Sequence, residues 1–344
     1  MYLTSKCNVP EEQQLSSGMT VVRRSMSDLN RSDVNRNDEN RDDINGNNAN
    51  PINNLLNVEN YRYVNNAYND TNLHLKNLSF SFWEDIVLPM NMYPQGICFT
   101  EEHLMVSMYS LDADCLGQVM IFDKLTGEYL LSLGMDVNSH LGGIAYDGNH
   151  IWVCNSSKKT IERISFDFIC NAIEKNTGST LDIRNLVESY PVTVVPSCIT
   201  YYDGQLWIAT HTKLYNSKMA SYYFSEEENK LFMKNFYTIP SKVQGVAFDE
   251  MGRVYLSTSY GRKFSSYLKI YASVENMSLS VENFMKKIEM PPCSEGLAMD
   301  DKQNIYVLFE SASEKYLEGT DGFGKSISPL DKILIIESLF NDQA

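Results

Sequence analysis

The stretch Gln244–Gly261, QGVAFDEMGRVYLSTSYG, contains two short apolar runs that flank a tight polar turn. Four other segments repeat this pattern: QGICFTEEHLMVSMYS from Gln95, GGIAYDGNHIWVCNSS from Gly142, SCITYYDGQLWIATHT from Ser197 and EGLAMDDKQNIYVLFES from Glu295. Successive units begin 47, 55, 47 and 51 residues apart. Self-similarity at a period of about 50 residues predicts a propeller or a solenoid.

Additional β-rich runs complete the repeat. A third run occurs at residues 118–123, 160–166, 267–272 and 332–337, and a fourth occurs at 129–135. Four strands in about 50 residues are typical of one propeller blade. Most units carry Gly at the head of the first strand, where backbones crowd around the channel, whereas the third unit has Cys198 there.

The ends of the repeat region predict how the ring closes. The last unit supplies only three strands, and an unassigned strand, FSFWEDIVL (80–88), precedes the first unit. Pairing this strand with the last blade leaves no long sheet edge exposed. The sequence therefore predicts an all-β fold, a five-bladed β-propeller over residues 76–344, whose N-terminal strand closes the last blade.

Residues 1–75 differ in composition from the repeats. Sixteen Asn lie between residues 27 and 72, mixed with charges of both signs and few apolar residues. Such a segment cannot bury enough apolar surface to offset its ordering entropy. We expect a disordered, Asn-rich tail, and a partner-docking segment within it is the alternative.

Charge and cysteine content restrict the partners and the compartment. A formal net charge of −15 argues against nucleic acid and against an anionic membrane, and is compatible with neutral or cationic ligands. No apolar run is long enough to span a membrane, and residues 1–14 lack the pattern of a signal peptide. Cys98 and Cys154 lie in apolar runs, so we expect buried free thiols and a cytoplasmic protein. A non-native start or unconventional export is the alternative.

The repeat pattern, an xGhAhD run, a turn, hYVh and hxhFD (h, hydrophobic), resembles the β-propellers of the NHL, gluconolactonase-like and streptogramin-lyase-like group. The resemblance covers about residues 80–340 and implies the architecture. It identifies no catalytic residue, and five blades depart from the six or seven that are usual in that group.

The topology predicts which residues meet at one mouth of the channel, where first strands begin and second strands end. Residues at the first-strand starts are Gln95, Gly142, Ser197, Gln244 and Glu295. Residues after the second strands are Tyr109, Asn155, His211, Tyr260 and Glu310, and His140 approaches the same mouth. Apart from Gly142 and Ser197, these residues are our candidate ligand-binding set. The opposite face is built from ordinary turn residues such as DGN and DGQ.

Glu295 and Glu310 are the strongest candidates. Both belong to the last blade, and two carboxylates in a crowded channel need a partner. That partner is His211, a lysine or a divalent cation such as Ca²⁺ or Zn²⁺. Glu295, Glu310 and His211 are therefore also the candidate catalytic residues.

Other motifs carry little chemistry. GTDGFGKS (319–326) lacks the glycine spacing of a phosphate-binding loop, so we interpret it as a loop. It belongs to the long stretch from Glu310 to Asp331, for which a lid or a binding loop is the natural role.

Two classes of function remain open. We favour a binding protein that recognises a small molecule, a glycan or a peptide at the mouth. The alternative is a hydrolase or lyase, lactonase-like, that uses the carboxylates and His as acid and base, with or without a divalent metal.

Overall fold

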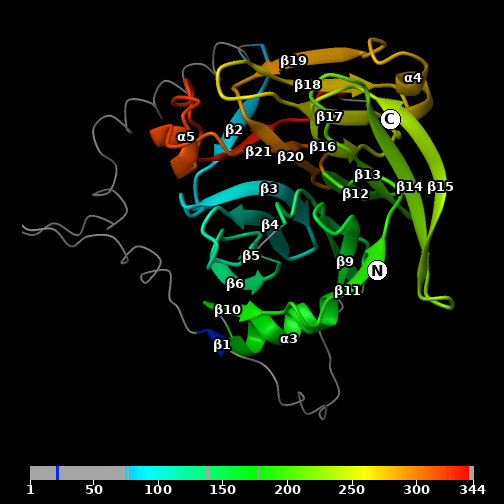
Figure 1. The fold of residues 1–344 in the computed structure, drawn as a ribbon. Coiled ribbons are helices and arrows are strands. Elements are labelled where there is room, and N and C mark those ends of the chain that lie inside the picture. Colours follow the sequence, from blue (N-terminus) through cyan, green and yellow to red (C-terminus); the bar gives the residue numbers. More distant parts are fainter. Residues whose placement is uncertain (1–20, 23–74, 76, 137–138, 177, 341–344) are drawn as a thin grey trace, which may run out of the picture.

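The computed structural model describes residues 21–22, 75, 77–136, 139–176 and 178–340. Its strands form five sheets, one for each repeat, arranged around a common centre (Figure 1). The predicted five-bladed β-propeller is confirmed. The predicted tail lies outside the described residues, except for Val21, Val22 and Leu75.

The first strand of each blade lies innermost. Blade 1 contains β3 (Met92–Phe99), β4 (His103–Ser110), β5 (Gln118–Asp123) and β6 (Tyr129–Gly134). Blade 2 contains β7 (Ile144–Tyr146), β8 (His150–Asn155), β9 (Thr160–Ser165) and β11 (Glu188–Pro191). Blade 3 contains β12 (Cys198–Tyr202), β13 (Gln205–Ala209), β14 (Ser217–Ser225) and β15 (Lys230–Ile239). Blade 4 contains β16 (Val243–Phe248), β17 (Val254–Thr258), β18 (Ser266–Tyr271) and β19 (Lys286–Met290).

Blade 5 closes the ring as predicted. It contains β20 (Ser294–Met299), β21 (Ile305–Phe309), β22 (Ile333–Ile336) and β2 (Phe80–Trp83). β2 pairs antiparallel with β22, from Phe80 opposite Ile336 to Trp83 opposite Ile333. Leu75, upstream of β2, is fully buried in the cluster that joins blades 4 and 5.

Alternation along the strands builds the core between the blades. In β8, Ile151 and Val153 pack towards blade 1, whereas Trp152 and Cys154 pack towards blade 3. This two-residue period lets one strand contribute to two clusters. Five hydrophobic clusters each draw on two neighbouring blades, so apolar packing continues around the ring.

Glycine at the head of the inner strands is required by close packing. A Cβ on Gly96 would lie 2.6 Å from the Cα of Gly143, and one on Gly245 would lie 2.7 Å from the amide nitrogen of Leu297. A side chain at either position would push neighbouring inner strands apart. Blade 3 places Cys198 against Gly143, which supplies the missing space.

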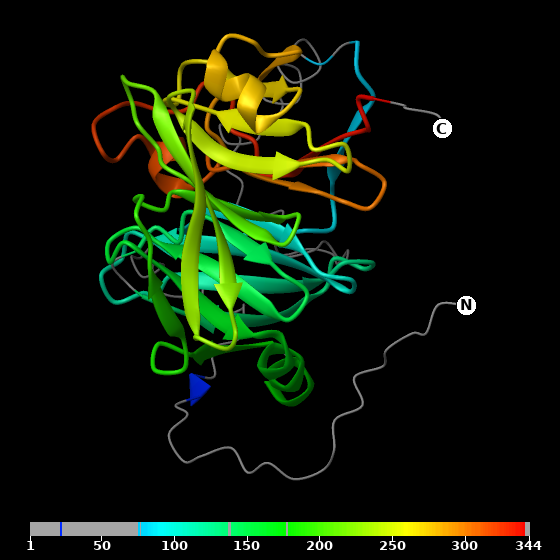
Figure 2. The same ribbon diagram turned by 90° about the vertical axis from the view of Figure 1, so that its right-hand side faces the viewer.

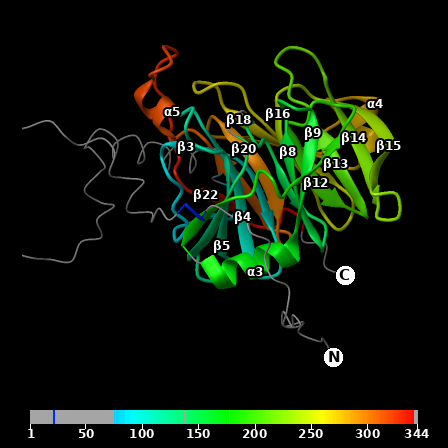
Figure 3. The same ribbon diagram turned by 60° about the horizontal axis from the view of Figure 1, so that its bottom comes forward.

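Several elements lie outside the repeat. β10 (Ser179–Asp182) pairs parallel to β6, and β1 (Val21–Val22) pairs with β10, so this sheet has six strands. The described residues also form three helices: α3 (Phe166–Asn176), α4 (Val274–Leu279) and α5 (Glu314–Glu318). Figure 2 shows α3 and α4 at the periphery of the sheets, and Figure 3 shows α5 projecting from the rim, away from α3.

Cys98 and Cys154 are 7% and 0% exposed, as predicted, and the described cysteines are free thiols. Within the described part of the chain, no helix is long and apolar enough to cross a membrane. The cytoplasmic location stays a prediction.

Candidate functional site

Three β-bulges turn polar side chains at equivalent positions of neighbouring blades towards one place. The strand registers of blades 1, 4 and 5 shift at Gln95, Gln244 and Glu295, respectively. A bulge redirects the side chain of the extra residue, and bulges are common beside functional sites. The repeat thus supplies three converging polar groups from blades 4, 5 and 1.

The convergence produces a buried carboxyl pair. Glu295 and Glu310 are 3% and 8% exposed, and a side-chain hydrogen bond joins them. Gln244 Nε2 donates to Glu295 Oε1 over 2.8 Å, and Gln95 Nε2 donates to Glu310 Oε2 over 3.2 Å. The hydroxyl of Tyr316 donates to Glu310 Oε1. The mouth positions predicted from the repeat therefore include one connected network.

Burial controls the protonation of the pair. Desolvation raises the pKa of Glu295 well above its ordinary value of 4.5, and the charge of Glu310 raises it further. Desolvation also raises the pKa of Glu310, while Tyr316 and the positive charge of Lys315 oppose that rise. The hydrogen bond between the two carboxyls raises the pKa of Glu295 and lowers that of Glu310, so Glu310 is the member that ionises first and Glu295 keeps its proton to higher pH.

Tyrosine rings line the space beside Glu310. Tyr93 and Tyr109 stack with centroids 4.9 Å apart, and Tyr316 meets Tyr93 edge-on at 6.3 Å. These rings form one buried cluster with Cys293. The Nζ of Lys315 donates to the hydroxyl of Tyr109 over 3.1 Å. Burial raises the pKa values of Tyr109 and Tyr316, so both hydroxyls keep their protons at neutral pH.

The long stretch between β21 and β22, residues 310–331, covers the pair, and we refer to it as the covering segment. Ser313 Oγ donates to the carbonyl of Met92 over 3.0 Å, which attaches the segment to blade 1. Leu330 N donates to Ser311 Oγ over 2.9 Å, which holds the two ends of the segment together.

Arg262, in the loop after β17, attaches the covering segment to blade 4. Its guanidinium bonds both carboxylate oxygens of Asp321, at 3.0 and 2.6 Å, and the carbonyl of Gly324 at 2.6 Å. Arg262 is 9% exposed. The GTDGFGKS stretch is therefore the part of the covering segment that blade 4 binds.

The two predicted histidines lie at the edges of the network. The ring centroid of His140 lies 4.4 Å from that of Tyr109, and the residue is exposed. His211 Nδ1 lies 3.2 Å from the carbonyl of Val243, and its side chain is hydrogen-bonded to Gln244. Partial desolvation lowers the pKa of both imidazoles, so both are neutral at pH 7. His211 reaches Glu295 through Gln244 rather than directly.

The structure does not bring Asn155 and Tyr260 to the carboxyl pair. Asn155 is fully buried and donates to Glu162 over 2.7 Å, within a separate polar cluster of blade 2. Tyr260 is 42% exposed, and Lys242 Nζ lies 4.8 Å from its ring centroid. Equivalent places in the repeat therefore have different surroundings in different blades.

Sequence reasoning missed several residues of the network: Tyr93, Arg262, Cys293, Lys315 and Tyr316. All five lie just outside the repeated motif or within the covering segment. The length of the segment from Glu310 to Asp331 was the available signal, but it does not show which side chains point inward. Burial and the nearby glutamates raise the pKa of the Cys293 thiol well above 9.0, so this thiol is a poor nucleophile.

No group of three or more His, Cys, Asp or Glu side chains in the described ranges is arranged to hold a metal ion. The predicted Ca²⁺ or Zn²⁺ therefore stays a prediction, to be tested by metal analysis of the purified protein.

Two surface hollows, each of about 460 Å³, lie apart from this network. One is lined by β2 and by turn residues of blades 1 and 5, including Trp83, Lys124 and Asp300. Asp300 already accepts hydrogen bonds from the backbone of Lys302 and Asn304 and from Tyr306. These groups stabilise a turn, which favours a structural role for the hollow.

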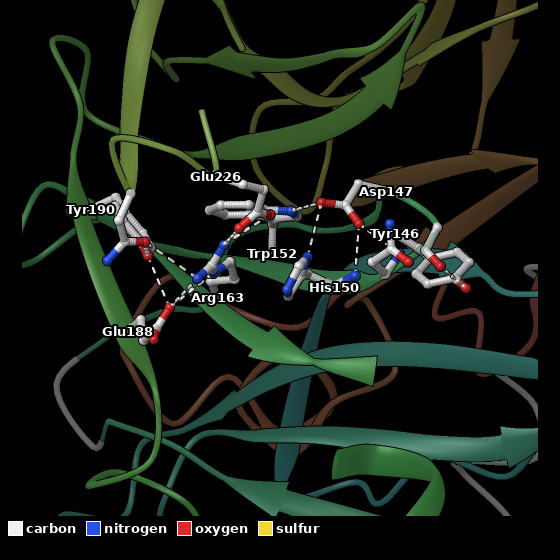
Figure 4. Close-up of polar contacts among 11 residues, drawn as sticks. Tyr146, Asp147, His150, Trp152, Arg163, Glu188, Tyr190 and Glu226 are labelled. Carbon is white, nitrogen blue, oxygen red and sulfur yellow. Dashed lines mark hydrogen bonds and ion pairs between the residues drawn. The ribbon is translucent and has the colours of Figure 1, made fainter. Parts of the chain in front are cut away.

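A second polar cluster lies between blades 2 and 3. Figure 4 shows the side chain of Arg163 reaching from β9 towards Glu188 and Glu226, at 2.6 and 3.2 Å. The guanidinium also lies 4.3 Å from the ring centroid of Phe224. Nearby, Asp147 accepts from Trp152 Nε1 over 2.7 Å. Hydrogen bonds within the cluster satisfy these groups, so the cluster joins two blades.

No protein-family model and no curated protein sequence matches the chain. Similar solved structures include glutaminyl cyclase from Myxococcus xanthus, at 10% identity and a TM-score of 0.42, covering 75% of this chain and 97% of that chain. The PQQ-bound form of aldose sugar dehydrogenase from Streptomyces coelicolor matches at 14% identity and a TM-score of 0.46, covering 75% and 98%, respectively. The site described above depends on the geometry of this chain alone.

Proposed function

We propose that the protein is a ligand-binding propeller that recognises a small molecule, a glycan or a peptide at the channel mouth, with Glu295 and Glu310 as the anchoring groups. One observation carries the proposal. Three bulges and a long insertion bring side chains from blades 1, 4 and 5 onto two buried carboxyl groups. Burying charge costs free energy, so a fold that only needed packing would gain by placing apolar residues here.

The test is a thermal-shift screen of the wild-type protein against defined probes. The panel contains Ca²⁺, Zn²⁺, neutral mono- and oligosaccharides, short acetylated peptides and small organic cations. We expect at least one probe to raise the melting temperature of the wild type and to lose that effect in E295Q/E310Q.

The matched control is Glu162→Gln, which changes a carboxyl group that is 2% exposed in blade 2, outside the network. A probe that anchors on the pair should still stabilise this variant. The proposal fails if folded E295Q/E310Q responds to every stabilising probe as the wild type does, or if no probe stabilises the wild type.

An acid–base enzyme is the second candidate, and the shared proton of the carboxyl pair favours it. Glu295 would act as the acid and Glu310 as the base, with neutral His211 connected through Gln244. The likeness to lactonase- and lyase-containing propellers is a similarity of repeat pattern, so it suggests lactones and esters only as first substrates to assay. Turnover that is lost in both E295Q and E310Q would favour this candidate over simple binding.

A further inference from the structure

The ammonium group of Lys315 lies among three tyrosine rings. Its Nζ is 4.7 Å from the ring centroid of Tyr93, 4.5 Å from that of Tyr316 and 5.7 Å from that of Tyr109. A cation within about 6 Å of a ring centroid is attracted to the electron-rich face, and aromatic cages use this attraction to recognise ammonium groups. We call Tyr93, Tyr109 and Tyr316 the tyrosine cage.

The polar groups of the cage suit a cation that carries N–H bonds. Lys315 Nζ donates to the Tyr109 hydroxyl over 3.1 Å, a contact that a quaternary ammonium cannot make. The hydroxyl of Tyr316 bonds Glu310, so one wall of the cage is attached to the ionised member of the carboxyl pair. The cage therefore offers aromatic faces, one hydroxyl acceptor and a nearby negative charge.

The cation in the cage comes from the covering segment and not from a blade. Lys315 lies in α5, is half-buried and ends a flexible side chain that can swing out to solvent at low cost. Arg262 also lies near Tyr316, 4.5 Å from the ring centroid, but its guanidinium is bound to Asp321 and Gly324. Of these two cations, Lys315 is the one that a ligand can replace.

We propose that the tyrosine cage recognises the primary ammonium group of a ligand, and that Lys315 fills the cage as an internal stand-in when no ligand is bound. This inference rests on the proposed function, because it names the ligand class of the same site. A free alkylamine and a lysine side chain of another polypeptide present the same chemistry.

The test replaces the internal cation with an external one. Lys315→Ala removes three methylene groups and the ammonium, which together correspond to n-propylammonium. We expect n-propylammonium to bind K315A at least about tenfold more tightly than the wild type, measured by calorimetry and by thermal shift. n-Propanol, the neutral analogue, should bind neither protein.

Two further variants and one further ligand test which groups of the cage recognise the cation. Lys315→Met keeps the side-chain length without the charge, so its thioether blocks the cage, and K315M should not bind n-propylammonium. Tetramethylammonium should bind K315A more weakly than n-propylammonium, because it cannot donate to Tyr109. In K315A/Y109F that preference should disappear, since Tyr109→Phe keeps the ring and removes the hydroxyl.

A second variant keeps the test decisive if K315A folds poorly. Arg262→Gln keeps Lys315 but loosens the covering segment, so its affinity for n-propylammonium should lie between those of the wild type and K315A. The inference is overturned if folded K315A, or R262Q where K315A does not fold, treats n-propylammonium and n-propanol alike.

The outcomes separate the two proposals and the two sources of the ligand. If no variant binds ammonium but a neutral probe still depends on the carboxyl pair, the ligand class is wrong and the binding function stands. If nothing depends on the pair, both proposals fail. Stronger binding of acetyl-Gly-Lys-Gly-amide than of n-propylammonium to R262Q would identify a lysine side chain as the ligand, and the reverse order would identify a free amine.

Discussion

Arg163 and Lys315 are two of the cations that lie against aromatic rings in this propeller, and their remaining contacts differ. Arg163 lies near the rings of Trp152, Tyr190 and Phe224 and forms ion pairs with Glu188 and Glu226. Lys315 lies among three tyrosines, and its Nζ donates to the neutral hydroxyl of Tyr109.

The contacts of the two side chains show which cation is part of the fold. Arg163 is on a strand of blade 2, its side chain is 10% exposed, and its charge is balanced by direct contact. Lys315 is on an insertion, half-buried, and the nearby negative charge is bonded to other groups. An aromatic cage with a removable cation, and with a carboxyl group beside it that forms no ion pair with that cation, has the properties of a ligand site.

Replacing Arg163 should have the largest effect. Arg163→Ala removes the packing of the guanidinium against the rings of Trp152, Tyr190 and Phe224, while its ion pairs with exposed glutamates add little, so we expect a loss of about 2–4 kcal/mol in the free energy of unfolding. Chemical denaturation measures this loss, and ammonium binding to K315A/R163A should equal that to K315A. A loss below about 1 kcal/mol would remove the contrast between the two cations.

Replacing Glu310 should have the next largest effect. Tyr316 and Gln95 both donate hydrogen bonds to the Glu310 carboxylate. Glu310→Gln places an amide N–H opposite one of these donors, so we expect the free energy of unfolding to fall by about 1–3 kcal/mol. Glu188→Gln is the matched control, because Glu188 is 55% exposed and its pair with Arg163 is solvated. Equal losses in the two variants by denaturant titration would contradict the view that Glu310 is buried and Glu188 is not.

Lys315→Met should change stability by about 1 kcal/mol or less, because the ammonium is half-buried and its cation–π contacts are offset by hydration. The covering segment keeps its bonds to Arg262 and Met92 in this variant. Thermal melting checks the prediction. A large loss would show that Lys315 holds the segment in place, as Arg163 holds its blades.

The last expected effect is a pH dependence at Glu295, which develops gradually as the pH changes. Its pKa is raised in the folded state, so the unfolded chain releases this proton near pH 4.5 while the folded chain retains it. This contribution to stability is therefore fully present below pH 4.5 and is lost as pH rises towards the folded pKa. Glu295→Gln removes this dependence. We therefore expect the melting temperature of the variant to rise relative to that of the wild type as the pH increases above 4.5. A constant difference would show that the carboxyl ionises as freely as in the unfolded chain.

Most of the fold could be predicted, because the features that build it recur in every repeat. The apolar alternation around Trp152 recurs along the blades, and glycines such as Gly96 and Gly245 meet the same packing need in every blade except blade 3. The unpaired strand at Phe80 was predictable from strand counting. The parallel addition of β10 to β6 was not, because β7, β8, β9 and α3 lie between the two strands in the chain and their pairing leaves no periodic signal.

The site was partly predictable for the same reason. Glu295 and Glu310 meet because antiparallel register places the start of one strand beside the end of the next. Lys315 and Tyr316 could not be assigned, since the covering segment has no counterpart in the other blades. Asn155 holds an equivalent repeat position, yet Glu162 of its own blade is its partner. The repeat therefore predicts the position of a residue on its strand. The contacts of its side chain depend on neighbouring residues that the repeat does not specify.

Closure of blade 5 by β2 has a consequence for biosynthesis. β2 is translated before the other strands of blade 5 and before β3 to β19 of blades 1 to 4, and its partner β22 is translated last, so its edge stays unpaired while about 250 residues are added. Contacts between such distant segments slow folding more than they weaken the product, because loop-closure entropy grows only slowly with length. We therefore expect pulse-labelled hydrogen exchange during refolding to protect blades 2 to 4 before β2 and β22. Simultaneous protection of all blades would show that the ring forms in one step.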